Sequence, residues 1–288
     1  MIRARCEVLS SRAAGAFQSV TLVAPEIAER AKPGQFVEVA VPDGRADFLR
    51  RPFFIHQASR RGGWAGTVEL IVDRRGPGST WLAGTQAHEF VDLIGPCGNG
   101  FGLPRPTNCL LFGIGYGAAP LYFLAEELRT RGKRVDMIVC ARSQDRLLKP
   151  IEGKRLAHSI TIVTGDGSVG ERAEPLDVLE ETLERSSSQV VYAVGPKETL
   201  RGAAELCRTR RIPAQMAVEE LMACGLGMCL TCVVPVTETR GGAVVNARAC
   251  VEGPVFNAGR VQWDRWLGTE VSEPSEEDVP AETSVAAK

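Results

Sequence analysis

Four of the nine cysteines have the spacing of a metal-cluster site. Cys224, Cys229 and Cys232 form a Cys-x4-Cys-x2-Cys motif, and Cys250 stands alone further along the chain. This spacing is typical of plant-type [2Fe-2S] centres, in which cysteine thiolates hold the two irons. Such a cluster accepts and donates single electrons. The pattern therefore predicts an electron-transfer site on these four thiolates.

Zinc is the alternative occupant, because four cysteine thiolates also satisfy a tetrahedral Zn²⁺ site. Zinc ribbons usually pair two short knuckles, whereas here three cysteines share one tight loop and the fourth follows an expected hairpin. Gly225 and Gly227 in that loop permit the backbone angles and the close approach that wrapping a cluster requires. The pattern favours iron-sulfur, and a β-branched residue at either glycine is expected to destabilise the cluster.

The other five cysteines are scattered singly along the chain. An odd number of cysteines cannot pair completely into disulfides, and thiols stay reduced in the cytosol. Residues 1–7 are typical of the start of a strand rather than of a secretory signal. We therefore expect a cytoplasmic protein in which these five are small buried side chains: Cys6, Cys97, Cys109, Cys140 and Cys207.

Two arginine-bearing segments have the composition of a phosphate site. Residues 50–55 (RRPFFI) are expected to end a strand, where an arginine neutralises a pyrophosphate and an apolar neighbour packs on a flavin ring or ribose. Residues 74–80 (RRGPGST) join a strand to a short helix and supply backbone N–H groups, hydroxyls and positive charge. A surface arginine pair and an ordinary Gly-Pro turn are the alternatives, and the residues alone leave both open.

A glycine-rich segment indicates a second nucleotide site. Residues 113–121 (GIGYGAAPL) follow an apolar strand and open a helix, so Gly115 and Gly117 let a dinucleotide approach the strand end. Ala118 takes the place of the last glycine of the strict fingerprint, and tight strand-to-helix packing without a ligand is the alternative. Gly195 follows another apolar strand, where a nicotinamide would lie. The choice between NAD and NADP stays open.

Three structural units are expected to position these segments, followed by a tail. Residues 1–103 alternate short apolar runs of period two with turns, which predicts an antiparallel β-barrel without a long helix. Residues 104–212 alternate strands and helices, which predicts a Rossmann-like α/β domain with a parallel sheet. Residues 213–267 form the cysteine-rich domain, and residues 268–288 a disordered acidic tail.

Individual elements follow from the same periodicities. The barrel strands are expected at 20–23, 36–39, 68–72 and 91–94. The strands of the α/β domain are expected at 109–112, 135–139, 160–163 and 190–193, and its helices at 119–131, 176–185 and 197–208.

Composition excludes two classes of partner. The 288 residues are 44% hydrophobic and 24% charged, as is ordinary for a folded globular protein. A net charge of −1 leaves no electrostatic footprint for nucleic acid. No run approaches the roughly 20 apolar residues of a membrane-spanning helix. We therefore expect neither nucleic acid nor membrane as a partner.

The motifs in their order resemble the ferredoxin-NADP reductase superfamily, and more narrowly the electron-transfer subunits of NAD-dependent dihydroorotate dehydrogenases. The order is RPFFI, GPGST, GPCGNGF, GYGAAPL and then the cysteines, and the resemblance runs from about Arg3 to Trp263. Its most specific parts are residues 220–229 (ELMACGLGMC) and 250–256 (CVEGPVF). The resemblance implies FAD on the barrel, NAD(H) on the α/β domain, and a [2Fe-2S] cluster facing a partner subunit that holds FMN, in a heterotetramer.

Residue by residue, the resemblance implies a set of flavin contacts. These are Arg51, Pro52, Phe53, Phe54, Ile71, Val72, Asp73, Gly78 and Ser79.

Three positions depart from the family pattern. Phe54 stands where the family usually has serine, so a hydroxyl near the flavin is missing. Asp73 stands where a basic residue is common, although Arg74 and Arg75 are close enough to supply charge. Val194 replaces a cysteine beside the nicotinamide site. We therefore expect altered flavin tuning from Phe54 and altered NAD(H) reactivity from Val194.

The predicted cofactors imply a division of work. A nicotinamide delivers two electrons as hydride and the cluster accepts one, so a flavin must lie between them. We expect no catalytic side-chain acid or base in this chain. The resemblance implies a subunit that passes electrons between dihydroorotate oxidation at the FMN of its partner, in pyrimidine biosynthesis, and NAD. The alternatives are the flavin subunit of a sulfide dehydrogenase-like or NADH-dependent ferredoxin-NADP reductase-like complex, and a zinc-stabilised nucleotide sensor without redox turnover.

Overall fold

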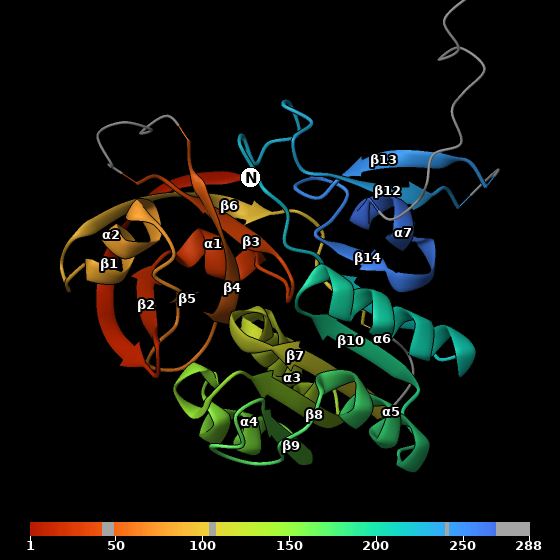
Figure 1. Cartoon of the computed structure of the whole chain (residues 1–288). Coiled ribbons are helices and arrows are strands. Elements are labelled where there is room, and N and C mark those ends of the chain that lie inside the picture. Colours follow the sequence, from red (N-terminus) through yellow and green to blue (C-terminus); the bar gives the residue numbers. More distant parts are fainter. Residues whose placement is uncertain (42–48, 104–107, 240–241, 269–288) are drawn as a thin grey trace, which may run out of the picture.

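The structure is a computed structural model that describes residues 1–41, 49–103, 108–239 and 242–268. The expected acidic tail lies outside the described residues except for Gly268. Three parts are visible in Figure 1: a barrel, a helix-covered sheet, and a smaller hairpin that lies above the sheet.

The N-terminal part is a closed antiparallel barrel, as predicted. Closure pairs each edge strand, which leaves no open sheet edge. Two short helices accompany it, α1 (Pro25–Arg30) and α2 (Pro77–Gly84), and no long helix is described there. The strand order is β1-β2-β5-β4-β3-β6, with β1 (Ile2–Ala14), β2 (Phe17–Val23), β3 (Phe36–Val39), β4 (Arg51–Ser59), β5 (Thr67–Val72) and β6 (Phe90–Cys97).

One strand prediction in the barrel is wrong. Residues 50–55 were expected to end a strand, but Arg51 is the first residue of β4 and pairs with Val39 of β3. Pro52 lacks a backbone N–H, and proline is tolerated near the beginning of a strand. The strand continues through His56, which is fully buried and donates a hydrogen bond from its Nδ1 to Ala119 O (2.8 Å). Arg51 therefore lies where the chain enters the barrel.

The middle part is a parallel sheet with helices on both faces, as predicted (Figure 1). Apolar side chains of α3 pack on one face and those of α5 and α6 on the other. The predicted helices and strands of this part are confirmed to within two residues at their ends. The parallel strands are β7 (Asn108–Ile114), β8 (Arg134–Ala141), β9 (Ser159–Thr164), β10 (Val190–Val194) and β11 (Ala214–Ala217); the helices are α3 (Ala119–Thr130), α4 (Pro150–Leu156), α5 (Pro175–Arg185) and α6 (Lys197–Thr209).

The same sheet continues past residue 212, the expected end of the α/β domain. Its order is β14-β11-β10-β7-β8-β9, and β14 (Val255–Asn257) is antiparallel to β11. The cysteine-rich segment is thus an insertion between two neighbouring strands, β11 and β14. The domain limits drawn from the sequence stay predictions.

The inserted segment contains a β-hairpin and is followed by a short helix. β12 (Val233–Thr237) pairs with β13 (Val244–Arg248), which confirms the hairpin expected between Cys232 and Cys250. The helix α7 (Trp263–Leu267) follows. The described ranges also contain the 3-10 turns η1 (Gly115–Ala118), η2 (Gln144–Arg146) and η3 (Ala258–Arg260). Across the described ranges, every helix is too short or too polar to cross a lipid bilayer.

Candidate functional site

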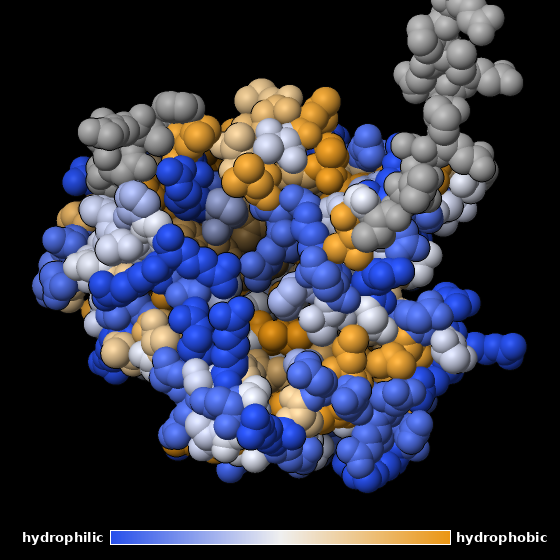
Figure 2. Space-filling view, in the orientation of Figure 1, coloured by the Kyte–Doolittle hydropathy of each residue, from blue (hydrophilic) through white to orange (hydrophobic). Residues whose placement is uncertain are grey.

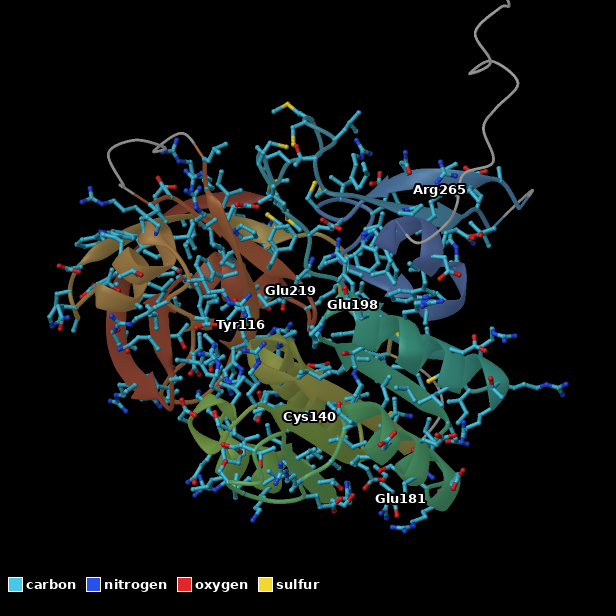
Figure 3. All side chains as sticks on the ribbon, in the orientation of Figure 1. Tyr116, Cys140, Glu181, Glu198, Glu219 and Arg265 are labelled. Atoms are coloured by element: carbon cyan, nitrogen blue, oxygen red, sulfur yellow. The ribbon has the colours of Figure 1, made fainter. Side chains whose placement is uncertain are left out.

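Among the described residues, we consider three cavities at the junction of the barrel and the sheet, and two residues line all of them. We call them the barrel cavity (about 370 Å³), the central cavity (about 120 Å³) and the sheet cavity (about 610 Å³). The shared residues are Tyr116 of η1 and Glu219, which follows β11. Figure 3 shows both in the space between the two parts. Elements distant in sequence therefore meet at one point.

The barrel cavity has the features expected of a pyrophosphate site. Arg51 of β4 lies over the first turn of α2, where a Cβ added to Gly78 would be 3.3 Å from Arg51 Nε. Ser79 Oγ accepts hydrogen bonds from the backbone N–H groups of Arg75 (3.0 Å) and Gly76 (3.1 Å), which orders the turn. A helix start beside a guanidinium favours an anion. Pro52, Phe53, Gly78 and Ser79 line this cavity with Arg51.

Asp73 also lines the barrel cavity, and two arginines neutralise it. Its Oδ2 accepts from Arg75 Nε and from Arg146 Nη2, each at 2.8 Å. Arg74 turns away and donates to Ala83 O at the end of α2 (3.1 Å). Of the two arginines expected to offset Asp73, Arg75 is the one that faces the site, since it lines both the barrel and the sheet cavities.

Ile71 and Val72 do not line any of the three cavities. Both side chains are fully buried among core residues at the end of β5. Only their backbone groups are left to reach a flavin, so their role as cofactor contacts stays a prediction.

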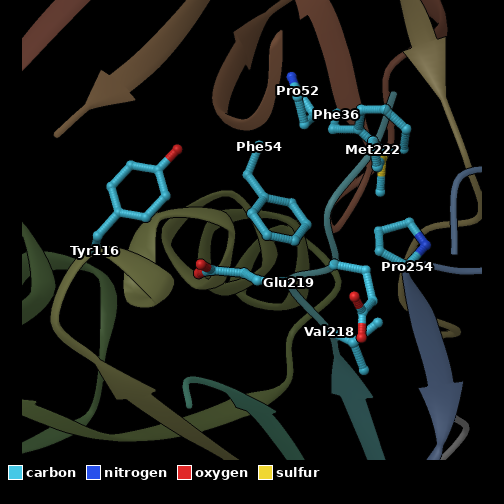
Figure 4. A pocket seen from close by; sticks show the side chains of 9 residues that line it. Phe36, Pro52, Phe54, Tyr116, Val218, Glu219, Met222 and Pro254 are labelled. Atoms are coloured by element: carbon cyan, nitrogen blue, oxygen red, sulfur yellow. The ribbon is translucent and has the colours of Figure 1, made fainter. Parts of the chain in front are cut away.

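The central cavity joins the barrel to the cysteine-rich segment (Figure 4). Phe54 forms part of its wall and is 8% exposed, so the phenyl ring stands where the family usually has a small hydroxyl. Met222 lines the same cavity, two residues before Cys224. The cavity wall is therefore continuous with the predicted cluster loop. The lining residues are Phe36, Pro52, Phe54, Tyr116, Val218, Glu219, Glu220, Met222 and Pro254.

The sheet cavity lies at the carboxyl ends of the parallel strands, where α/β sheets bind nucleotides. It brings together the three predicted glycines: Gly115, Gly117 and Gly195. A Cβ added to Gly117 would lie 3.3 Å from Gly195 N and 3.3 Å from Glu219 Oε1, so a side chain there would crowd the cavity. Its cationic lining suits an anionic dinucleotide and consists of Arg75, Arg142, Arg146 and Lys197.

Sequence reasoning missed Tyr116 and Glu219 as site residues. Burial raises the pKa of both side chains, and Glu219 and Arg75 act in opposite directions on Tyr116. Arg75 also lies over the Tyr116 ring, 5.6 Å from its centroid. One signal was present: Glu219 is the first acidic residue after the apolar strand β11, at the sheet edge where ligands bind.

The four predicted cluster cysteines lie at the base of the hairpin and in the loop before it. Cys232 and Cys250 are buried, and Ala249 N donates to Cys232 O (2.8 Å) across the hairpin base. Cys229 interacts with Cys224, and Cys250 interacts with both Cys232 and Cys224. No set of three or more metal-binding side chains in the described ranges converges on one point. Four cysteine thiolates, three of them in one short loop, are the ligand set of a plant-type [2Fe-2S] cluster.

The environments of the thiols differ. Hydrogen bonds with Thr231, and to a smaller extent with Cys224, lower the pKa of the exposed Cys229 to about 6. Burial raises the pKa of Cys250 to about 12, and the neighbouring Cys232 contributes to the rise. Because metals bind thiolates, occupation of the site must release the proton of Cys250.

The loop conformation agrees with the role expected of its glycines. Gly225 and Gly227 both have left-handed backbone angles, with φ of 63° and 82°. A Cβ on Gly225 would collide with the carboxyl group of Glu38 from β3, and one on Gly227 would be 2.6 Å from Val251 Cγ2. The four cysteine thiolates and the loop conformation thus fit a [2Fe-2S] cluster.

Comparison with a family model supports this site. The model of the iron-sulfur cluster binding domain of dihydroorotate dehydrogenase B matches residues 219–262, which contain all four cysteines. The match favours iron-sulfur over zinc.

Comparison with a solved structure covers the whole fold. A structure of NADH-dependent reduced ferredoxin-NADP oxidoreductase is 26% identical, with a TM-score of 0.79 and coverage of 92% of both chains. The predicted reductase-like fold class is confirmed.

Curated relatives extend the similarity over most of the chain. The dihydroorotate dehydrogenase B (NAD(+)) electron transfer subunit of Desulforamulus reducens is 33% identical over 242 residues, 84% of this chain and 90% of the relative. The subunit of the same name from Geobacillus thermodenitrificans is 34% identical over 263 residues, 90% of this chain and 98% of the relative. With this identity over nearly the full length of both relatives, the chain belongs to the family of dihydroorotate dehydrogenase B (NAD(+)) electron transfer subunits.

Proposed function

We propose that this chain is the electron-transfer subunit of a dihydroorotate dehydrogenase, an oxidoreductase of pyrimidine biosynthesis. It carries electrons between NAD and a partner that oxidises dihydroorotate to orotate. One observation carries the proposal: the barrel, central and sheet cavities meet at Tyr116 and Glu219, and the central cavity ends at the loop of Cys224. Sites for a flavin, a nicotinamide and a cluster are thus adjacent.

The barrel and central cavities are the proposed FAD site. Arg51 and the first turn of α2 hold the pyrophosphate, while Pro52, Phe53 and Phe54 pack beside the ring. FAD, when bound, supplies the conversion between hydride and single electrons. The side chains of the chain position the cofactor and exclude water from the central cavity.

The sheet cavity is the proposed NAD(H) site. Gly115, Gly117 and Gly195 leave room for the dinucleotide at the ends of β7 and β10. The arginines of this cavity neutralise the pyrophosphate. Val194, directly before Gly195, is fully buried. Its hydrocarbon side chain offers no reactive group to the nicotinamide.

The proposed partner binds over the cluster loop and holds FMN. Four large apolar side chains around Cys229 are exposed: Leu221 (75%), Met228 (77%), Leu230 (60%) and Val251 (39%). Figure 2 shows apolar residues gathered at the top of the molecule, where this loop lies in Figure 1. An exposed apolar patch of this kind marks an interaction site. A heterotetramer of two such pairs is the assembly we propose.

Anaerobic purification tests the proposal. The chain, produced together with an FMN-containing dihydroorotate-oxidising subunit, should contain FAD and about two irons and two acid-labile sulfides per chain. NADH should bleach the flavin, and the complex should reduce NAD⁺ with dihydroorotate. A protein with one zinc and no flavin would overturn the proposal.

A second candidate rests on the similar solved structure. That structure is of an NADH-dependent reduced ferredoxin-NADP oxidoreductase. Recovery of this chain with a large iron-sulfur flavoprotein, and no reaction with dihydroorotate, would favour that type of complex.

A further inference from the structure

Glu219 occupies the point where the three cavities meet. It comes two residues after β11 and lines the barrel, central and sheet cavities alike. Its Oε1 lies over Gly117, close to Gly195 N at the end of β10. In Figure 4 the carboxyl group points into the space beside Phe54 and Tyr116. A group bound in any of these cavities would lie next to this carboxyl.

The proposed function creates a need for a proton at this point. On the nicotinamide side the reaction is NADH → NAD⁺ + H⁺ + 2 e⁻, and the hydride carries both electrons. On the cluster side two electrons leave, one at a time, without a proton. One proton per electron pair must therefore be released when electrons run from NADH to the cluster, and taken up when they run the other way.

The other titratable groups around the cavities are poorly suited to this task. Asp73 is held by two arginines, and Glu220 by Lys197 and by Trp266 Nε1 (2.6 Å). Burial raises the pKa of Tyr116 far above neutrality. Glu219 also lines these cavities, and its carboxylate forms no hydrogen bond or ion pair with the described residues.

We propose that Glu219 is the residue that holds this proton. In the direction from NADH, a bound reduced flavin would lose its N–H proton as two electrons pass to the cluster. The carboxylate of Glu219 would accept that proton, forming an O–H bond, and would then release it to water in the sheet cavity. In the direction from dihydroorotate it delivers a proton taken from that water. The inference rests on the proposed function and adds a proton-carrying side chain that the sequence did not predict.

The electrostatic surroundings agree with this role. Burial raises the pKa of Glu219, Arg75 opposes the rise, and Asp73 reinforces it. A carboxyl whose pKa moves toward neutrality can both accept and donate a proton at physiological pH. The ionisable groups facing it come from several elements: Arg51, Asp73, Arg75, Tyr116, Arg142, Arg146, Lys197 and Glu220.

Single-turnover reduction by NADH tests the inference in the flavin- and cluster-loaded complex. Flavin bleaching reports the arrival of electrons, and the reduced-cluster signal reports their exit. In Glu219→Gln, bleaching should stay within about twofold of the wild type, because hydride transfer needs no such carboxyl. Cluster reduction should slow by about 100-fold and lose its pH dependence. Glu219→Asp should restore part of the rate, and Glu181→Gln, on the distant helix α5 (Figure 3), should behave as the wild type.

A measurement without turnover separates a proton-holding role from a structural one. The visible absorption of the oxidised flavin should shift with pH as Glu219 ionises, with a transition above the ordinary glutamate range. The transition should disappear in Glu219→Gln, move in Glu219→Asp, and persist in Glu181→Gln. An unchanged transition and unchanged cluster reduction in Glu219→Gln would overturn the inference. A wild-type flavin that NADH does not bleach would instead overturn the proposed function.

Discussion

The carboxyl group of Glu38, on barrel strand β3, lies directly against Gly225 of the cluster loop. Glu38 is 1% exposed, and its Oε1 has no hydrogen-bond partner among the described residues. The space above this carboxyl admits a glycine and nothing larger. The barrel wall thus determines how closely the cluster loop approaches the flavin-binding part.

Replacement of Gly225 by alanine should reduce cluster content. The new Cβ would collide with Glu38, and the left-handed backbone angle costs about 1–2 kcal/mol for any residue with a Cβ. Gly132→Ala is the matched control, because Gly132 has a φ of 71° and open space around it. Iron and sulfide per chain should fall in Gly225→Ala and stay normal in Gly132→Ala. Equal cluster content in both would contradict the proposed packing.

Glu38 should make stability depend on pH. Burial raises its pKa from 4.5 to about 7, although Arg50 and Arg51 oppose the rise. The pKa of Glu38 is higher in the folded protein than in the unfolded chain. At pH values between these two pKa values, the folded protein therefore keeps the proton that the unfolded chain loses. The contribution of Glu38 to the free energy of unfolding is fully present below pH 4.5. It falls by about 3 kcal/mol as the pH rises through 7.

Thermal unfolding midpoints at several pH values check this expectation. The difference between the wild type and Glu38→Gln should change between pH 5 and 7 and then level off, in favour of the variant at high pH. Glu181→Gln, an exposed residue of α5, should show no such change. A pH-independent difference would show that the Glu38 pKa is not raised.

Arg51→Ala should weaken FAD binding by about 10- to 100-fold, the effect of losing a charged hydrogen-bond donor to a phosphate. Arg51 lines the barrel cavity, whereas Arg74 donates to Ala83 O, away from it. Arg74→Ala should therefore retain FAD. Flavin fluorescence during titration of the flavin-free proteins measures both affinities, and equal losses would place the pyrophosphate elsewhere.

Met228→Asp should disrupt partner binding without loss of cofactors. Met228 is 77% exposed beside Cys229, so a charge there would have to be buried on docking. Leu9→Asp is the control, since Leu9 is an exposed apolar residue of β1, on the barrel. Co-purification with the dihydroorotate-oxidising subunit should fall for Met228→Asp alone. If both variants bind equally well, the partner docks on another face.

The cluster and the order of the structural units were predictable from the sequence. Cys224, Cys229 and Cys232 lie in one short loop, so their spacing alone restricts the chemistry to a few metals. Period-two runs and alternating strands and helices predicted the barrel and the parallel sheet because these patterns reflect which face of each element is buried. The strand beginning at Arg51 was misplaced because the burial of His56 depends on α3, far along the chain.

The meeting of Tyr116 with Glu219, and of Glu38 with Gly225, was decided by the tertiary structure. Each pair joins residues far apart in sequence, and no local pattern shows that the two members of a pair meet. A glutamate in a short strand such as β3 is typical of a solvent-facing position, yet Glu38 is buried because the cluster loop covers it. Local sequence determines which side chains a segment carries and how the segment folds. The packing of barrel against sheet determines the solvation and the neighbours of those side chains, and these set their proton affinity.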